Sequence, residues 1–482
     1  MTLQKTQERA SPVIIWFRQD LRLKDNPALL AAGGEVIPVY ILDESEGLRA
    51  PGGASRWWLD KSLRRLDEDL RALGSRLILR QGPAESVLGQ LIEETGAKAL
   101  HWNRLYDAAS IARDRSIKQH YSDAGIVCRS FNGALLNEPW DIANGSGAPY
   151  RVFTAYWRAA RSRIGEVHAE TAPTRLASPP DWPESDSLSD WRLHPSSPDW
   201  SAGFGDWEPG EAGAGRLLTR FLEESLSGYG DARDRPDLLG TSRLSPHLHF
   251  GEIGPAQVWR ATLDAVARGA SAKEADKFLS EIGWREFHHH LLFYNPQLAT
   301  RNFRSEWDGF SWRDDEEGFR AWTEGLTGYP IVDAGMRELW ATGFMHNRVR
   351  MIAASFLIKD LLIDWRRGEA WFWDTLVDAD QAQNAANWQW VAGSGADAAP
   401  YFRIFNPVTQ GLKFDPDGAY IRRWVPELAK VPTAVIHEPW KAVAGSAPRL
   451  ALPGAGDYPR PIVDHASARD RALQAYAALR AA

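Results

Sequence analysis

The sequence has a single cysteine, Cys128, among 482 residues, so a disulfide within the chain is excluded. Long apolar runs are also missing. The stretch from Met351 to Leu362 is interrupted by Lys359 and Asp360 and is too short to span a bilayer. The N-terminal segment MTLQKTQERASP is polar, so we expect no secretory signal. These absences predict a protein of the reducing cytoplasm without a membrane partner.

The chain has no excess of basic residues either. Its net charge is -7, which argues against a generally basic nucleic-acid-binding protein but allows a local basic groove. No GxGxxG follows the first apolar run, so the usual dinucleotide fingerprint is missing. Consecutive His288, His289 and His290 point to different faces of a helix, so no metal site is predicted.

Tryptophan, by contrast, is abundant, with 23 residues. Most are expected in aromatic cores, where large rings contribute much buried area. A few tryptophans spaced around a redox cofactor would instead carry electrons, and composition does not separate these two interpretations.

The first part of the chain alternates short apolar runs with helical periodicity. Residues 55–73 and 85–95 have the apolar spacing of helices. Strands that alternate with helices predict βαβ units and a parallel, Rossmann-like sheet. The apolar runs are residues 13–17, 36–42, 77–79, 99–102 and 126–128.

The composition changes between residues 171 and 215, where Pro, Ser, Asp and Gly accumulate. A flexible linker would not hold four tryptophans, so we expect this connector to lie against a domain surface. The tryptophans are Trp182, Trp191, Trp200 and Trp207. The remainder has helical periodicity and ends in an Ala-rich helix at 466–481. We predict an α/β domain at 1–135, a connector at 136–215 and an all-helical domain at 216–482.

Two segments of the helical part are polar where a core would be apolar. Residues 240–246 hold Thr and Ser side chains that either cap a helix or cradle a phosphate. Residues 281–287 place Glu281 and Arg285 four apart on one helix face, where they could form an ordinary ion pair.

A second pair of segments raises the question of a buried charge. Arg350 lies in an otherwise apolar helix, and an unpaired buried charge is costly. Asp378 and Asp380, followed by Asn384, supply acidic partners for it. We therefore predict an ion pair between Arg350 and one of these carboxylates.

Taken together, these segments resemble the photolyase/cryptochrome family. The likeness runs from the Trp16–Arg22 motif to His437–Trp440, nearly the whole chain. Between these ends, five motifs match the family in order and spacing: residues 241–245, 284–287, 327–334, 345–348 and 384–403. The resemblance implies an N-terminal antenna-binding Rossmann-like domain and an all-helical catalytic domain that binds FAD.

The resemblance also implies how FAD is held. Arg350 would stabilise the negative charge of the reduced flavin and pair with Asp378. Asn384 takes the position that faces flavin N5, where photolyases usually carry Asn, plant cryptochromes Asp and insect cryptochromes Cys. The expected FAD-binding residues are Tyr229, Thr241, Ser242, Arg243, Leu244, Ser245, Phe278, Arg285, Asn347, Arg350, Asp378, Asp380 and Asn384.

The activity implied is that of a deoxyribodipyrimidine photo-lyase, a carbon–carbon lyase. Excited FADH⁻ would donate an electron to a cyclobutane pyrimidine dimer in DNA, the ring would open, and the electron would return. Trp388, Trp365 and Trp312 match the family chain that carries electrons from the surface to an oxidised flavin. For any single tryptophan, core packing is the alternative.

The dimer is expected to enter the site as a flipped-out dinucleotide. Glu281 and Asn347 would hydrogen-bond the pyrimidine edges, and Met351 would pack near the ring. In (6-4) photolyases, histidine usually occupies the positions of Asn347 and Met351. Neither residue is histidine here, so (6-4) repair is disfavoured. Trp284 and Trp390 would form apolar walls. Phosphate contacts are expected from Arg233, Arg348 and Gln410, with Arg403 and Lys413 as further candidates.

The second, light-harvesting chromophore is less constrained. Residues 54–59 look like class III photolyases, which favours 5,10-methenyltetrahydrofolate. Ala109, Ser110 and Thr300 depart from the folate pattern of class I, so a deazaflavin or FMN stays open. A cryptochrome-like blue-light receptor is the alternative function, disfavoured because only a short segment follows Trp440. A flavin-binding protein that has lost its light chemistry is a third possible function. No obligate protein partner is evident.

Overall fold

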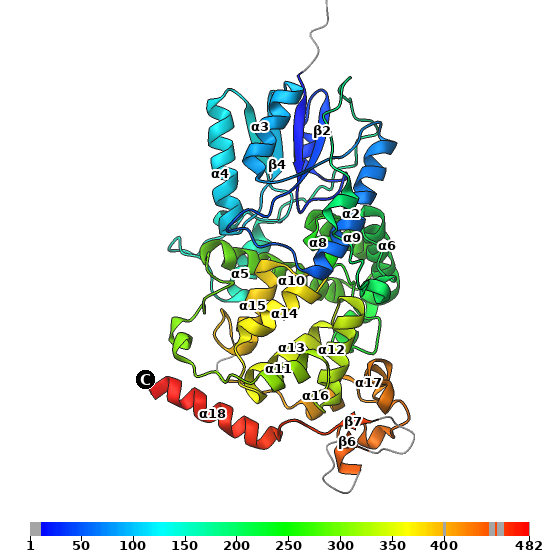
Figure 1. Ribbon diagram of the computed structural model, residues 1–482, viewed down its shortest axis with the longest axis vertical. Coiled ribbons are helices and arrows are strands. Elements are labelled where there is room, and N and C mark those ends of the chain that lie inside the picture. Colours follow the sequence, from blue (N-terminus) through cyan, green and yellow to red (C-terminus); the bar gives the residue numbers. More distant parts are fainter. Residues whose placement is uncertain (1–10, 399–401, 443–448, 451–456, 482) are drawn as a thin grey trace, which may run out of the picture.

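A computed structural model describes residues 11–398, 402–442, 449–450 and 457–481. Residues 399–401 of the motif that ends at Arg403 lie outside the described residues. The chain forms a parallel sheet flanked by helices and a larger helical part (Figure 1). The predicted α/β + α fold class is therefore confirmed.

The sheet has five parallel strands in the order β3-β2-β1-β4-β5. Their bounds are β1 (Val13–Phe17), β2 (Val36–Leu42), β3 (Ile78–Gln81), β4 (Ala99–Asn103) and β5 (Val127–Phe131). Each predicted apolar run becomes one of these strands, with small shifts at the ends of β3, β4 and β5. The continuous apolar runs of β1 and β2 reflect burial on both faces, whereas the edge strand β5 is partly exposed.

The two faces of the sheet are covered by different helices (Figure 1). Because successive side chains on a strand alternate, Ile15 and Phe17 pack with helix α2, whereas Ile14 and Trp16 pack with α3 and α4. These helices, with a short first one, are α1 (Pro27–Leu30), α2 (Gly53–Ala72), α3 (Ala84–Thr95) and α4 (Ala108–Asp123).

The connector lies against the sheet domain, as the sequence predicts. Ala177 accepts a hydrogen bond from Val36 N at the start of β2, with N and O 2.8 Å apart. Trp191 and Trp207 are buried in the core beneath α2, and Trp182 and Trp200 pack against neighbouring cores. The four tryptophans therefore anchor an irregular segment by burying apolar area.

The helical part begins with α5 (Phe153–Arg163), which packs on the long helix α10. The helices that follow are α6 (Glu211–Arg220), α7 (Tyr229–Ala232), α8 (Ser245–His249), α9 (Pro255–Ala267), α10 (Ala272–Tyr294), α11 (Glu316–Thr323), α12 (Pro330–Thr342), α13 (Asn347–Ser355), α14 (Trp365–Thr375), α15 (Gln381–Ala392), α16 (Pro407–Phe414) and α17 (Ala419–Trp424). The largest core lies among α12 to α15.

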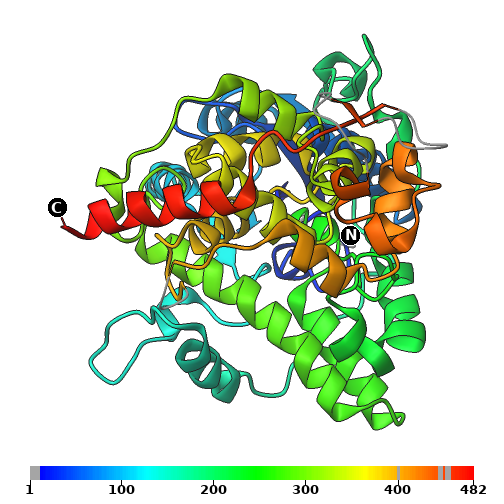
Figure 2. The same ribbon diagram turned by 90° about the horizontal axis from the view of Figure 1, so that it is seen from below.

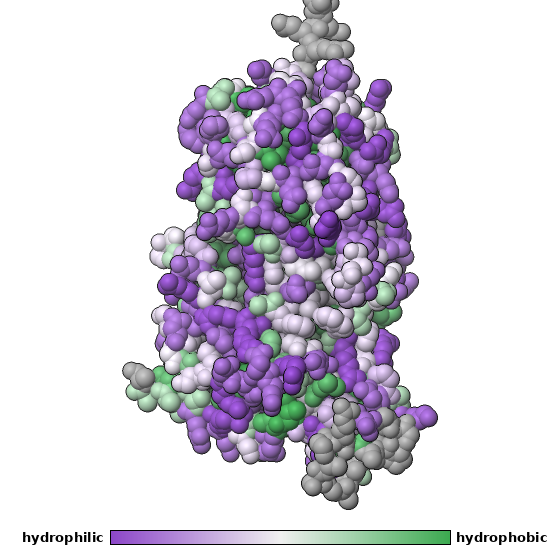
Figure 3. All heavy atoms as spheres, viewed as in Figure 1, coloured by the Kyte–Doolittle hydropathy of each residue, from purple (hydrophilic) through white to green (hydrophobic). Residues whose placement is uncertain are grey.

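The chain ends in a hairpin of β6 (Arg449–Leu450) and β7 (Tyr458–Pro459), followed by α18 (His465–Ala481). Helix α18 is the predicted Ala-rich helix, and it crosses the lower end of the helical part (Figure 2). Polar side chains cover most of the face that Figure 3 shows. Within the described residues, no helix combines the length and apolar character needed to cross a membrane.

Candidate active site

A cavity of about 490 Å³ opens among helices of the helical part. This volume lies within the range of small-molecule sites. Nineteen of the residues predicted for cofactor, substrate or electron transfer line it: Tyr229, Arg233, Thr241, Ser242, Leu244, Ser245, Phe278, Glu281, Trp284, Arg285, Asn347, Arg348, Arg350, Met351, Asp378, Asp380, Asn384, Trp388 and Trp390. Motifs more than 150 positions apart therefore converge on one cavity.

Four predicted residues do not line the cavity: Arg243, Gln410, Trp365 and Trp312. Arg243 has a left-handed backbone with φ of 53°. Its guanidinium lies over the rings of Trp207, 4.2 Å from the centroid, and Phe344, at 5.1 Å. Its side chain therefore packs on aromatic rings outside the lining, and its role in holding FAD stays a prediction. Gln410 lies on α16, outside the lining.

The predicted buried ion pair is present. Arg350 donates to both oxygens of Asp378, with nitrogen–oxygen distances of 3.1 and 2.8 Å. Asp378 Oδ2 also accepts from the Ser245 hydroxyl at 2.6 Å, and Arg350 Nε donates to Met345 O at 2.7 Å. Such bidentate pairs fix orientation as well as charge. Arg350 is thus a rigidly held cation in the cavity wall.

Asp380 provides an ionised carboxylate in the same wall. It caps α15 by accepting from Ala382 N and Gln383 N at 3.0 and 2.9 Å. Burial alone would raise the pKa of Asp380, but the nearby side chains of His289, His249 and Arg285 outweigh it and lower that pKa. The wall therefore carries a negative charge beside the cation of Arg350.

The side-chain amide of Asn384 has a defined orientation. Its Nδ2 donates to the backbone oxygen of Glu369 at 3.0 Å and to the Oε1 of the same residue at 2.9 Å. Both neighbours are acceptors, so only the NH₂ group can face them. The amide oxygen is thereby left as the acceptor that Asn384 offers to the cavity.

The mouth of the cavity combines cations with aromatic rings. Arg348 pairs with Asp234 at 2.8 Å and lies over the ring of Phe414, 4.4 Å from its centroid. Lys413 lies over the same ring at 5.0 Å. Two cations thus pack on one aromatic ring, and the basic rim for DNA phosphates stays a prediction.

Glu281 pairs with Arg233 across the mouth, not with Arg285. Arg285 instead donates to the backbone oxygen of Ala134 at 2.7 Å. The ordinary ion pair that the spacing of 281 and 285 could have formed is therefore absent. One oxygen of Glu281, Oε1, is therefore already engaged by Arg233.

Two tryptophans form flat apolar walls. Trp284 stacks on Phe153, with ring centroids 3.7 Å apart and planes at 8°. Trp390 Nε1 donates to the backbone oxygen of Asp397 at 3.1 Å. Each indole is thus held in one plane, which suits stacking against a flat base.

The comparisons with known proteins agree with this geometry. Residues 13–178 match the DNA photolyase family, and residues 278–478 match the FAD binding domain of DNA photolyase. A deoxyribodipyrimidine photo-lyase of Agrobacterium fabrum is 54% identical over 477 residues, covering 98% of this chain and 99% of that protein. This chain belongs to the photolyase/cryptochrome family.

Both branches of the family contain similar proteins. Cryptochrome-2 of Arabidopsis thaliana is 40% identical, over 97% of this chain and 79% of that protein. The crystal structure of a class III photolyase from Agrobacterium tumefaciens matches with a TM-score of 0.95 and 52% identity, covering 100% of both chains. The match to this structure includes both the sheet domain and the helical part.

The three tryptophans that were predicted to carry electrons lie in one region. Trp388 lines the cavity, Trp365 is fully buried, and Trp312 is half-buried, all packed in the core of α12 to α15. Trp365 Nε1 donates to Asn302 Oδ1 at 3.0 Å. The indole of Trp388 lies over Gly368, where a Cβ would be 2.2 Å from its Cη2.

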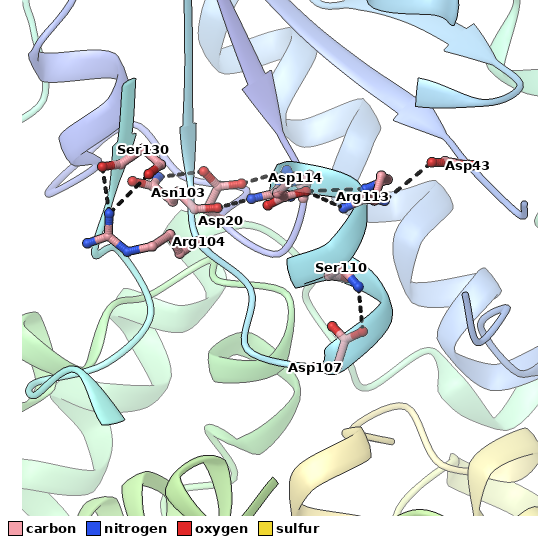
Figure 4. A network of polar contacts seen from close by, with 10 residues as sticks. Asp20, Asp43, Asn103, Arg104, Asp107, Ser110, Arg113, Asp114 and Ser130 are labelled. Atoms are coloured by element: carbon pink, nitrogen blue, oxygen red, sulfur yellow. Dashed lines mark hydrogen bonds and ion pairs between the residues drawn. The ribbon is translucent and has the colours of Figure 1, made fainter. Parts of the chain in front are cut away.

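A second cavity of about 190 Å³ lies between the sheet and the helical part. The residues of the sheet domain that line it include the carboxyl ends of β1 and β2 and the segments that follow β1, β2 and β4, at the edge where open parallel sheets bind ligands. Arg18, in this lining, bonds Asp114 at 2.7 Å. Arg113 reaches Asp43 at 3.3 Å, and both of these residues also line the cavity (Figure 4). His249, Arg285, Ala379 and Asp380 line both cavities.

Sequence reasoning missed several residues of the 490 Å³ cavity, among them His249, His288 and Gln383. His288 hydrogen-bonds Gln383 Oε1 at 2.7 Å, and burial lowers its pKa to about 4, so it is neutral near pH 7. The run of three histidines was considered only as a metal site. Its polarity directly before the apolar residues Leu291 and Leu292 was the available signal.

Glu286 makes the stability of the fold depend on pH. It is buried and accepts from Leu136 N and Asn137 N at 2.9 and 3.1 Å, and burial raises its pKa from 4.5 to about 7. Between pH 4.5 and about 7 the native state binds more protons at Glu286 than the unfolded chain does. The free energy of unfolding therefore falls as the pH rises through this range, by about 3 kcal/mol in total. Glu286→Gln should remove that loss.

Urea unfolding at pH 5 and pH 8 tests this prediction. The glutamine variant should gain stability over the native protein at pH 8 relative to pH 5. An identical change with pH in both proteins would show that Glu286 does not titrate in this window.

Proposed function

We propose that this chain is a cyclobutane pyrimidine dimer photolyase that binds FAD in the 490 Å³ cavity. The observation that carries the proposal is the convergence of the Arg350–Asp378 pair, Asn384 and the tryptophan walls on that cavity. Residues 1–135, 136–215 and 216–482 then form the antenna-binding domain, the connector and the catalytic domain, and the enzyme acts on DNA in the cytoplasm.

The donor set of the cavity fits FAD. The hydroxyls of Ser242 and Ser245 and the guanidinium of Arg285 are suited to the diphosphate and ribityl chain. When bound and reduced, FAD supplies the light-driven electron that opens the cyclobutane ring. Arg350 stabilises negative charge at the ring, because a preorganised cation needs no rearrangement when that charge forms. Asn384 offers its amide oxygen to a protonated N5.

The lesion would enter above this site. A damaged base step is cheap to unstack, and Trp284 and Trp390 provide surfaces for its rings. Glu281, Asn347 and Met351 would contact the dimer itself. Arg233, Arg348 and Gln410 would contact phosphates, which makes binding weaken with added salt.

The 190 Å³ cavity is the proposed site of the light-harvesting chromophore. His289 lines it, and neither ring nitrogen of this buried side chain has a hydrogen-bond partner within the described residues. Ser55 and Leu59, from the segment that resembles class III photolyases, also line it. We propose 5,10-methenyltetrahydrofolate, with a deazaflavin or FMN as the alternatives that extraction of the chromophore distinguishes.

A cryptochrome-like receptor is the competing function, supported by the 40% identity with Arabidopsis cryptochrome-2. Asn at position 384 favours repair over it. The deciding experiment is repair of an oligonucleotide with one defined thymine dimer by the reduced protein. We expect repair under blue or near-ultraviolet light and none in darkness. Bound flavin without repair under light would reject the photolyase and favour the receptor.

A further inference from the structure

A loop of the sheet domain reaches the helix that supports Asn384. Arg49, between β2 and α2, donates to both oxygens of Glu369 on α14, at 2.7 and 2.8 Å. The Glu369 side chain is only 4% exposed, so the pair is shielded from water on the carboxylate side. The guanidinium also lies over the ring of Trp373, 3.8 Å from its centroid. These contacts join residues 320 positions apart.

The rest of the loop is fixed to the same helix. Trp373 Nε1 donates to Ala50 O at 2.9 Å, and Gly53 N donates to Asp374 Oδ1 at 2.8 Å. At Gly52, a Cβ would be 2.2 Å from the backbone oxygen of Trp373, so only glycine allows this approach. Arg49 is therefore held against α14 by its neighbours as well as by its charge.

Glu369 links Arg49 to Asn384, which lines the 490 Å³ cavity. Its Oε1, which accepts from Arg49, also accepts from Asn384 Nδ2 at 2.9 Å. One carboxylate oxygen thus joins a cation of the sheet domain to the amide at the cavity wall. Arg49 neutralises a buried negative charge that would otherwise lie beside the cofactor.

We propose that Arg49 is a positioning residue of the light reaction: through Glu369 it sets the charge and the amide orientation beside the flavin. This inference rests on the proposed function, because it requires FAD in the cavity with Asn384 near its N5. The α/β domain then completes the flavin site in addition to holding an antenna chromophore. Arg49 and Trp373 also line the second cavity, so the relay begins where that chromophore would bind.

The charges of Arg49 and Glu369 predict that substituting either residue shifts the midpoint potential of the bound flavin, in opposite directions for the two residues. In Arg49→Gln the carboxylate of Glu369 loses its counter-charge, and an anionic reduced flavin becomes less stable. In Glu369→Gln the cation of Arg49 is unpaired, and the reduced flavin becomes more stable. We expect about a tenfold change in opposite directions, which is ~59 mV in a one-electron midpoint potential. The double variant should return close to the native potential.

The test measures the midpoint potential of the bound flavin in each purified variant, with thermal unfolding recorded in parallel. Arg49→Lys keeps the charge but not the bidentate geometry, so it should stay near the native potential even if stability falls. Asp374→Asn is the matched control, because it removes the charge of an exposed acceptor for the same loop without touching Glu369. It should leave the potential unchanged.

The outcomes separate the two proposals. A native protein without flavin, or with flavin and no repair, rejects the proposed function. A native protein that binds flavin and repairs dimers, with potentials of both single variants unmoved or moved in the same direction, rejects the relay alone. If Arg49→Gln does not fold, Glu369→Gln decides: a raised midpoint potential, with Arg49→Lys near the native value, supports the relay, and an unmoved or lowered one rejects it.

Discussion

Arg350→Ala is expected to lower light-driven dimer repair by about 10²–10³-fold, the usual effect of removing one preorganised charge partner. The guanidinium is held by both oxygens of Asp378 at 3.1 and 2.8 Å, so its charge is fixed at the cavity wall. Removing it also leaves the buried carboxylate of Asp378 unpaired, which should cost about 3 kcal/mol of unfolding free energy. Repair rates under saturating light and urea unfolding measure the two effects.

A second arginine serves as the control for this loss. Arg337 donates through its Nη1 to both oxygens of Glu427, at 2.9 and 2.8 Å, away from the cavity. Arg337→Ala should lower stability by on the order of 1 kcal/mol and leave repair per folded molecule unchanged. Arg350→Lys should recover part of the activity. Native repair in folded Arg350→Ala would contradict the electrostatic role.

Trp388→Phe is expected to abolish nearly all photoreduction of the oxidised flavin while chemically reduced protein still repairs dimers. The indole lines the cavity and touches Phe372, with ring centroids 5.0 Å apart. Phenylalanine keeps much of the packing but is far harder to oxidise, so electron supply should fail before the fold does. Absorption changes under blue light, with an external reductant, measure photoreduction.

Trp322 is the matched control for this substitution. Its ring lies 6.2 Å from that of Trp388, and its Nε1 donates to Ala353 O at 3.0 Å. Since Trp322 does not line the cavity, Trp322→Phe should preserve photoreduction. Equal photoreduction in native and Trp388→Phe protein would exclude Trp388 as the proximal electron donor.

Local patterns were enough to predict much of the fold and one ion pair. The apolar runs became the strands because a sheet buried on both faces requires continuous apolar sequence. An acidic partner for Arg350 was predictable because an isolated buried charge is costly. Few carboxylates in the polar segments of the sequence could serve as that partner. Motif order across the chain then supplied most of the cavity lining.

Contacts set by tertiary packing were not predictable. The spacing of Glu281 and Arg285 allowed an ion pair, but Glu281 pairs with Arg233 from a different helix region. The side chain of Arg243 turns toward aromatic rings that local sequence does not reveal. Arg49 and Glu369 lie in different structural parts, and no periodicity connects them. Such partners depend on how two folded parts dock.

The lack of a side chain at Gly368 restricts which residues helix α14 can carry at this position. Any side chain at that position would have to occupy space already taken by the indole of Trp388, 2.2 Å away from an added Cβ. A substitution would therefore tilt the ring at the cavity wall and alter the gap across which an electron must travel. The identity of one helix residue is dictated by a ring on its neighbour, so these two positions can vary only together.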